Sequence, residues 1–95
     1  MDENALLNGL RNGDSSCYDE LQTIYEEDLI IFAFLMLHDG DKAHETVERM
    51  LRQLFKNNGF TDATLPLHAF LYKKLRVECD TEIWNSYAGP ETGPS

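Results

Sequence analysis

Residues 15–37 read SSCYDELQTIYEEDLIIFAFLML, and this stretch decides the fold. Its second half, the run LIIFAFLML at 29–37, is apolar on every side, so we expect it at the centre of the core. Taken alone, the run is also compatible with a buried strand, but it continues a helical pattern without any breaker, which favours a helix. That pattern has apolar side chains at steps of three and four, at Tyr18, Leu21, Tyr25, Leu29, Phe32 and Met36.

Two more helices are predicted, one before the pair Asn12-Gly13 and one after the acidic turn His38-Asp39-Gly40-Asp41. A first helix over about 3–11 ends at Asn12-Gly13, a typical C-terminal signal, and Asp14 or Ser15 caps the long helix. We expect Asp41 to cap a third helix that ends at 57–59. Its apolar stripe is regular, at Val47, Met50, Leu51, Leu54 and Phe55.

After a loop over 60–66, a fourth helix is predicted over about 66–85, with Pro66 near its first turn. Its expected buried residues are apolar, namely Leu67, Phe70, Leu71, Leu75 and Cys79. The predicted fold class is therefore all-α, a compact bundle of about four helices. We assign residues 1–86 to this domain and interpret the Gly/Pro segment 87–95 as a disordered tail or a truncated linker.

Composition sets the protein class. The chain has 95 residues, of which 42% are hydrophobic, which is enough for one small core. The nine-residue apolar run is too short to cross a bilayer, since a spanning helix needs about twenty residues. The acidic start lacks the basic region of a signal peptide, so we expect a cytoplasmic protein without a membrane partner.

Cys17 and Cys79 match no zinc spacing, and we expect two buried reduced thiols, with a disulfide as the alternative.

Catalytic signatures are missing from the sequence: it has no Gly-rich phosphate loop, GxSxG or HExxH motif. Side chains able to bind a metal do gather at 38–45, but the twelve-residue calcium pattern is absent. We interpret that segment as a helix-capping turn. We therefore expect no enzyme activity, no metal and no cofactor.

Charge is distributed unevenly along the chain, although its net value of −9 argues against nucleic acid as a partner. Residues 1–48 carry a net charge of −10, residues 49–76 carry +5, and residues 77–95 carry −4. A basic middle between acidic ends indicates two differently charged surfaces, and ordinary solvated helix faces are the alternative.

Three segments carry a family resemblance. LLNGLRNGDSSCYDELQTIYEEDLIIFAFLML (6–37), HDGDKAHETVERMLRQLFKN (38–57) and LHAFLYKKLRVECDTEIW (67–84) resemble, in this order, the helices of region 2 of bacterial sigma-70 superfamily factors. The extracytoplasmic-function group is the most similar. The resemblance covers about residues 5–85 and rests on the order and spacing of all three segments.

This resemblance implies two binding surfaces. In the family, the third helix binds the clamp helices of the largest subunit of RNA polymerase core. The matching residues here are His44, Glu45, Glu48, Arg49, Arg52 and Gln53. The following loop and the fourth helix of the family meet the melted −10 promoter element. The matching residues are Asn57, Asn58, Phe60, His68, Phe70, Lys73, Lys74 and Arg76, a set of cations, amides and rings suited to single-stranded DNA.

The sequence also departs from the family. Glu48-Arg49 replaces the usual Gln-Glu pair, and Arg76-Val77 replaces Arg-Asn. Past Arg76 the family turns basic, whereas this chain has Glu78, Asp80 and Glu82, which would repel phosphates. The domain that reads the −35 element does not follow within these 95 residues.

Several functions therefore remain open at this point. The first is a sigma-like transcription regulator that binds polymerase and promoter DNA. The second is a sigma-like protein without promoter recognition, which acts by protein contacts as an antagonist or adaptor and has an anti-sigma or other regulatory protein among its partners. The third is an unrelated helical interaction domain. If the apolar face of 15–37 exceeds what three partner helices cover, we expect a dimer or a partner protein to cover the excess.

Overall fold

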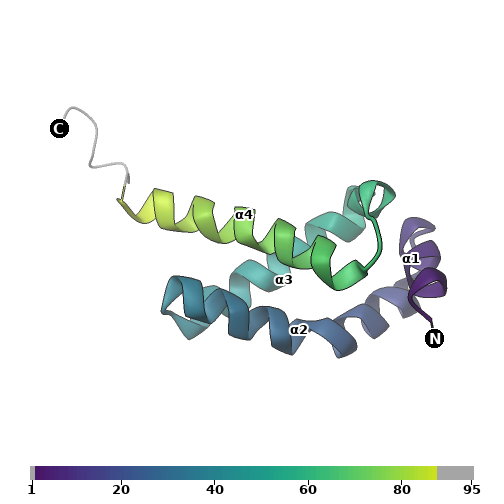
Figure 1. Cartoon of the computed structure of the whole chain (residues 1–95), viewed down its shortest axis with the longest axis horizontal. Helices are drawn as coiled ribbons and strands as arrows, with labels where there is room; N and C mark the ends of the chain where they lie inside the picture. Colours follow the sequence, from purple (N-terminus) through teal and green to yellow (C-terminus); the bar gives the residue numbers. More distant parts are fainter. Residues whose placement is uncertain (1, 88–95) are drawn as a thin grey trace.

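Helices make up the whole framework of residues 2–87, the part of the chain that the computed structural model describes, and that part contains no strand. The elements are α1 (Glu3–Arg11), α2 (Ser15–Leu37), α3 (Gly40–Lys56), a short 3-10 helix η1 (Gly59–Asp62) and α4 (Leu67–Tyr87) (Figure 1). The predicted all-α fold with four helices is confirmed. Tyr87, expected in the tail, ends α4, and the rest of that tail lies outside the described residues.

Short-range caps set most helix ends. The Asp2 carboxylate accepts from the backbone N–H of Ala5 at 2.7 Å, and Gly13 turns the chain with φ of +76° before α2 begins. The cap of α3 lies two residues before the expected Asp41. His38 takes the left-handed conformation that ends α2, so the next extended residue, Asp39, caps α3 by accepting from Lys42 N at 3.1 Å. Asp41 instead lies in the first turn.

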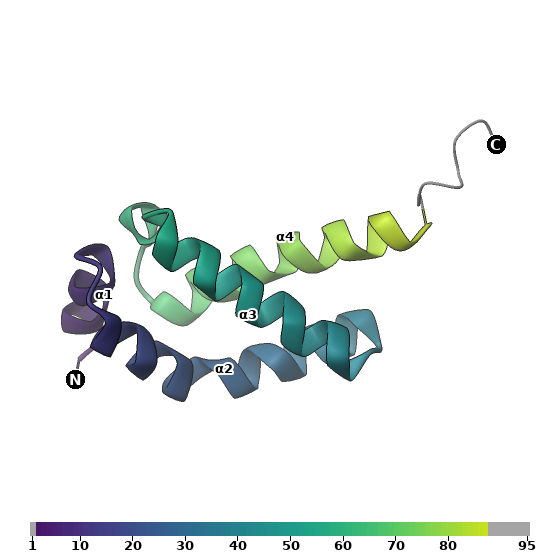
Figure 2. The same cartoon turned by 180° about the vertical axis from the view of Figure 1, so that it is seen from behind.

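Helix α2 is the element that α1, α3 and α4 all contact. In Figures 1 and 2, α3 and α4 lie along α2, and α1 packs at its N-terminal end. Leu21, Leu29 and Ala33 of α2 are fully buried at these contacts. The approach of α1 is close, because a Cβ on Gly9 would overlap the Sγ atom of Cys17.

The second half of α2 is less buried than predicted. Leu29 and Ala33 face the core, but 54% of Ile31 and 65% of Leu35 are exposed, and Phe34 is exposed as well. The expectation that the whole run 29–37 lies at the centre of the core is therefore wrong. The reason is geometric: α1 covers the other end of α2, so only α3 and α4 pack on this half, and its outer side has no neighbour among the described residues.

Two charged residues of α1 fasten the connection between α3 and α4. The Glu3 Oε2 atom accepts from the backbone N–H of Leu67 at 2.6 Å, which caps the start of α4 from a distant part of the sequence. The Arg11 guanidinium donates to the carbonyl oxygens of Phe60 at 3.0 Å and Ala63 at 2.8 Å. The Phe60 carbonyl also accepts from the backbone N–H of Ala63 at 3.1 Å, so the guanidinium adds a second bond there and supplies a partner to the Ala63 carbonyl.

Both cysteines are free and buried, as predicted. Burial, together with the nearby carboxylates of Asp80, Glu78 and Glu82, raises the pKa of the Cys79 thiol to about 11. Burial also raises the pKa of Cys17. Both thiols are therefore held in the unreactive protonated form at neutral pH.

Replacing Glu3 tests the distant cap. We expect Glu3→Ala to lower the free energy of unfolding by about 1–3 kcal/mol, because it leaves the partly buried Leu67 N–H without its acceptor. Chemical denaturation followed by circular dichroism measures the change. Asn4→Ala, at an exposed position of the same helix, is the matched control and should stay within about 0.5 kcal/mol of the parent. Equal stability of the two variants would contradict the cap.

Candidate functional site

The α3 outer face, defined here as His44, Glu45, Glu48 and Arg52, contains four of the six predicted polymerase contacts. All four are exposed or half-exposed, while the apolar side chains of the same helix, Val47, Met50 and Leu51, are buried. His44 Nε2 lies 3.7 Å from the Glu48 carboxylate, one turn further along. The helix therefore offers solvent a row of charged side chains on a rigid support, because its other side is held in the core.

Arg49 occupies a different place from the one predicted. Its guanidinium lies 3.1 Å from Glu82 Oε2 and 3.8 Å from Glu78 Oε1, both on α4, and Lys42 adds a pair with Glu82 at 3.6 Å. Arg49 therefore ties α3 to α4 and is turned away from the α3 outer face. The same pairs neutralise two of the three carboxylates that were expected to repel DNA.

The two predicted stacking rings lie in the core. Phe60 is fully buried and Phe70 is only 9% exposed, and their ring centroids lie 6.2 Å apart. A ring stacks on an unpaired base only when one of its faces is free. The expected stacking role of Phe60 and Phe70 is therefore inconsistent with their burial. The Arg11 bonds hold η1, and with it Phe60, against α1.

The remaining predicted DNA contacts are exposed, namely Asn57, Asn58, His68, Lys73, Lys74 and Arg76. Lys73 and Arg76 line a groove with Phe32 and Tyr72 on the side of α4 toward α2, whereas Lys74 faces α3 with its ammonium 5.6 Å from the centre of the Phe70 ring. Lys73 and Lys74 also line one pocket together. The three basic residues therefore form a connected strip along α4.

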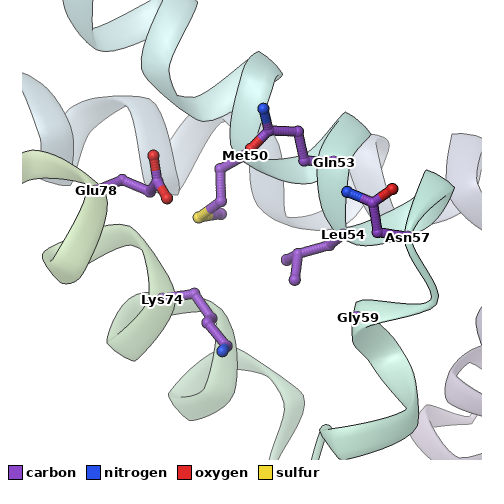
Figure 3. Close-up of a pocket in the computed structure, with 7 residues that line it drawn as sticks. All are labelled: Met50, Gln53, Leu54, Asn57, Gly59, Lys74 and Glu78. Atoms are coloured by element: carbon purple, nitrogen blue, oxygen red, sulfur yellow. The ribbon is translucent and has the colours of Figure 1, made fainter.

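A pocket between α3 and α4 joins the two predicted sets of residues (Figure 3). Gln53 from the polymerase set and Asn57 and Lys74 from the DNA set line it, and Met50 and Leu54 supply its apolar part. Its volume of about 210 Å³ is below the range of about 300–1,000 Å³ usual for small-molecule sites. It suits a side chain of a partner better than a nucleotide.

The sequence anticipated an excess of apolar surface on 15–37, and the structure places this surface where α2 meets α4. Phe32 and Tyr72 meet there edge to face, with ring centroids 5.2 Å apart, and Val77 is 58% exposed beside them. The signal in the sequence was the all-round apolarity of 29–37, which leaves one side of the helix to be covered by something other than α3 and α4.

Comparisons with known proteins do not extend the family resemblance: no family model, no curated protein and no solved structure matches this chain. Within residues 2–87 there is no group of three or more His, Cys, Asp or Glu side chains placed to hold a metal ion. None of the described helices combines the length and apolar character needed to cross a membrane.

The position of Arg49 leads to a stability prediction. We expect Arg49→Met to lower the free energy of unfolding by about 1 kcal/mol, because its pairs with Glu78 and Glu82 are partly exposed and therefore screened. Arg52→Met, on the α3 outer face, should leave stability within about 0.5 kcal/mol of the parent. Denaturant titration compares the two, and a double-mutant cycle with Glu82→Gln should show coupling for Arg49 and none for Arg52.

Proposed function

We propose that this domain is a sigma factor-like transcription regulator that binds the clamp helices of the RNA polymerase largest subunit through the α3 outer face. One observation carries the proposal. At the place in the helix order where the resemblance puts the polymerase contact, α3 is packed on one side and charged on the other, at His44, Glu45, Glu48 and Arg52.

The charge order along α3 supports a helical partner. Glu45 and Glu48 lie toward the N-terminal end of the α3 outer face, and Arg52 lies toward its C-terminal end. The exposed Lys56 follows one turn later. A partner helix with the opposite order of charges would fit in one orientation and be repelled in the other. Such complementarity fixes the register and the direction of binding more than it adds affinity.

The same proposal includes a contact with promoter DNA, without base stacking by Phe60 and Phe70. Lys73, Lys74 and Arg76 are exposed cations that can track phosphates, and Asn57 and Asn58 are exposed amides at the start of the loop. With Phe60 and Phe70 in the core, base stacking is not assigned to them. The promoter contact that we propose is therefore electrostatic and tolerant of sequence.

The second candidate function is a sigma-like protein that has lost promoter recognition and acts as an antagonist or adaptor of sigma factor or polymerase. The burial of Phe60 and Phe70 favours this candidate, because these two rings then cannot stack on the unpaired bases of melted DNA. This second candidate either occupies the clamp, and then differs from the first only in DNA binding, or binds another regulatory protein.

Binding to purified bacterial RNA polymerase core tests the clamp contact. We expect the domain to bind core and the variant His44→Ala/Glu48→Lys/Arg52→Glu to bind at least about tenfold more weakly, because the charge order of the contact is reversed. Fluorescence anisotropy measures both. Lys73→Glu/Arg76→Glu, with two changes on exposed α4 positions, is the control and should bind core like the parent. Absence of core binding by the parent would contradict the proposal.

Titration with single-stranded −10 DNA separates the two candidates. If promoter contact is retained, binding weakens with salt, and Lys73→Glu/Lys74→Glu/Arg76→Glu abolishes it, because the cations that pair with phosphates are reversed. A parent domain that binds core but shows no DNA binding at low salt would assign the second function. Binding that the triple variant retains would contradict the role given to these three residues.

A further inference from the structure

The proposed function leaves the apolar surface between α2 and α4 unused. We call it the α2–α4 face and define it as Ile31, Phe32, Leu35, Tyr72 and Val77. Two adjoining grooves make it continuous, since both are lined by Phe32 and Tyr72. Ile31, Leu35 and Val77 are each more than half exposed, at 54%, 65% and 58%.

The size of this surface matches the centre of a protein interface. Large side chains bury on the order of 150–250 Å² each, so these exposed fractions leave a few hundred Å² of apolar surface in contact with water. A patch of this size is as large as the largest one on a typical monomer. A standard interface buries about 800 Å² per partner and is a little more than half apolar. The face therefore supplies roughly the apolar part of one standard interface.

Opposite charges flank the two sides of the face. Asp28 lies on its α2 side, beside Ile31 and Leu35, and Lys73 and Arg76 lie on its α4 side, beside Val77. All three side chains are exposed, and the ion pairs within residues 2–85 do not involve them. Asp80 bounds the groove one turn beyond Arg76. The face is thus acidic along α2 and basic along most of α4.

We propose that the α2–α4 face binds the same face of a second copy of this chain, forming a two-fold symmetric dimer. Helices α2 and α4 run side by side in the same direction (Figures 1 and 2). A two-fold axis parallel to them, lying in the interface, places α2 of one copy over α4 of the other. That rotation keeps each residue at its level along the helices, so Asp28 of each copy comes nearest to Lys73 of the other, with Arg76 one turn further along, and each charged contact forms twice.

The other face-to-face arrangement is excluded by charge. A two-fold axis perpendicular to the helices would place α2 on α2, which brings Glu27 and Asp28 of both copies together. Like charges that meet in an interface cost several kcal/mol. An apolar partner without charges would leave Asp28, Lys73 and Arg76 unpaired at its edge. Self-complementarity of charge is therefore the reason for assigning a second copy as the occupant.

The proposal is independent of the polymerase contact, because the α3 outer face remains free in the dimer. It does cover Lys73 and Arg76, so the dimer and a phosphate backbone would compete for the same cations. The test uses the isolated full chain without polymerase or nucleic acid, and its result therefore stands apart from the outcome for the proposed function.

Sedimentation equilibrium over a range from low micromolar to sub-millimolar protein is the first test. We expect the mass to rise from 10.9 kDa toward twice that value as concentration increases. Ile31→Glu/Leu35→Glu should remain monomeric throughout, with circular dichroism confirming that this exposed pair leaves the fold intact. Leu65→Glu, at an exposed apolar position outside the face, should dimerise like the parent. A parent that is monomeric at every concentration would overturn the proposal.

A charge exchange tests the arrangement itself. Asp28→Lys alone and Lys73→Glu/Arg76→Glu alone should each be monomeric, because each homodimer then places like charges together twice. Mixed in equal amounts, the two variants should form a heterodimer, since both contacts again join opposite charges. Mass photometry or ultracentrifugation with one variant carrying a fluorescent label reads out the mixed species. Homodimers of either variant as strong as the parent, or no association on mixing, would overturn the proposed pairing.

Discussion

The burial of one side of α2 is the constraint on which the rest of the structure depends. Leu21, Leu29 and Ala33 must be covered, and α1, α3 and α4 each cover part of that side. Because α1 is short and lies at one end, the other end of α2 receives only two neighbours. The exposed side chains Ile31 and Leu35 follow from this shortage of partners, and so does the proposed use of that surface in association.

Charge then divides the remaining surface by function. Arg49 and Lys42 join α3 to Glu78 and Glu82 of α4, which removes four charges from any binding role. What remains on α3 is the outer row from His44 to Arg52, and what remains on α4 is the basic strip that contains Lys73 and Arg76. The two proposed contacts therefore use charged residues that do not pair α3 with α4.

The helices could be predicted from the sequence because their signals are local. Gly13 and the apolar period of α3 each act within one or two turns of the chain. The burial of Phe60 could not be predicted, since it depends on Arg11, which lies 49 residues earlier. The pairing of Arg49 is of the same kind, because periodicity places it on the polar side of α3 but does not show which edge of that side faces α4. Local signals therefore decide the helices, while long-range contacts decide the site.

Photo-crosslinking to RNA polymerase core tests the central claim most directly, because it reports which surface touches the partner without weakening the contact. A photoreactive amino acid would replace Glu45 on the α3 outer face, Leu35 on the α2–α4 face or Asn4 on α1, all exposed positions. We predict that position 45 crosslinks to the largest subunit and that positions 35 and 4 do not. Crosslinks from position 35 with none from position 45 would contradict the assignment of the α3 outer face as the polymerase-binding surface.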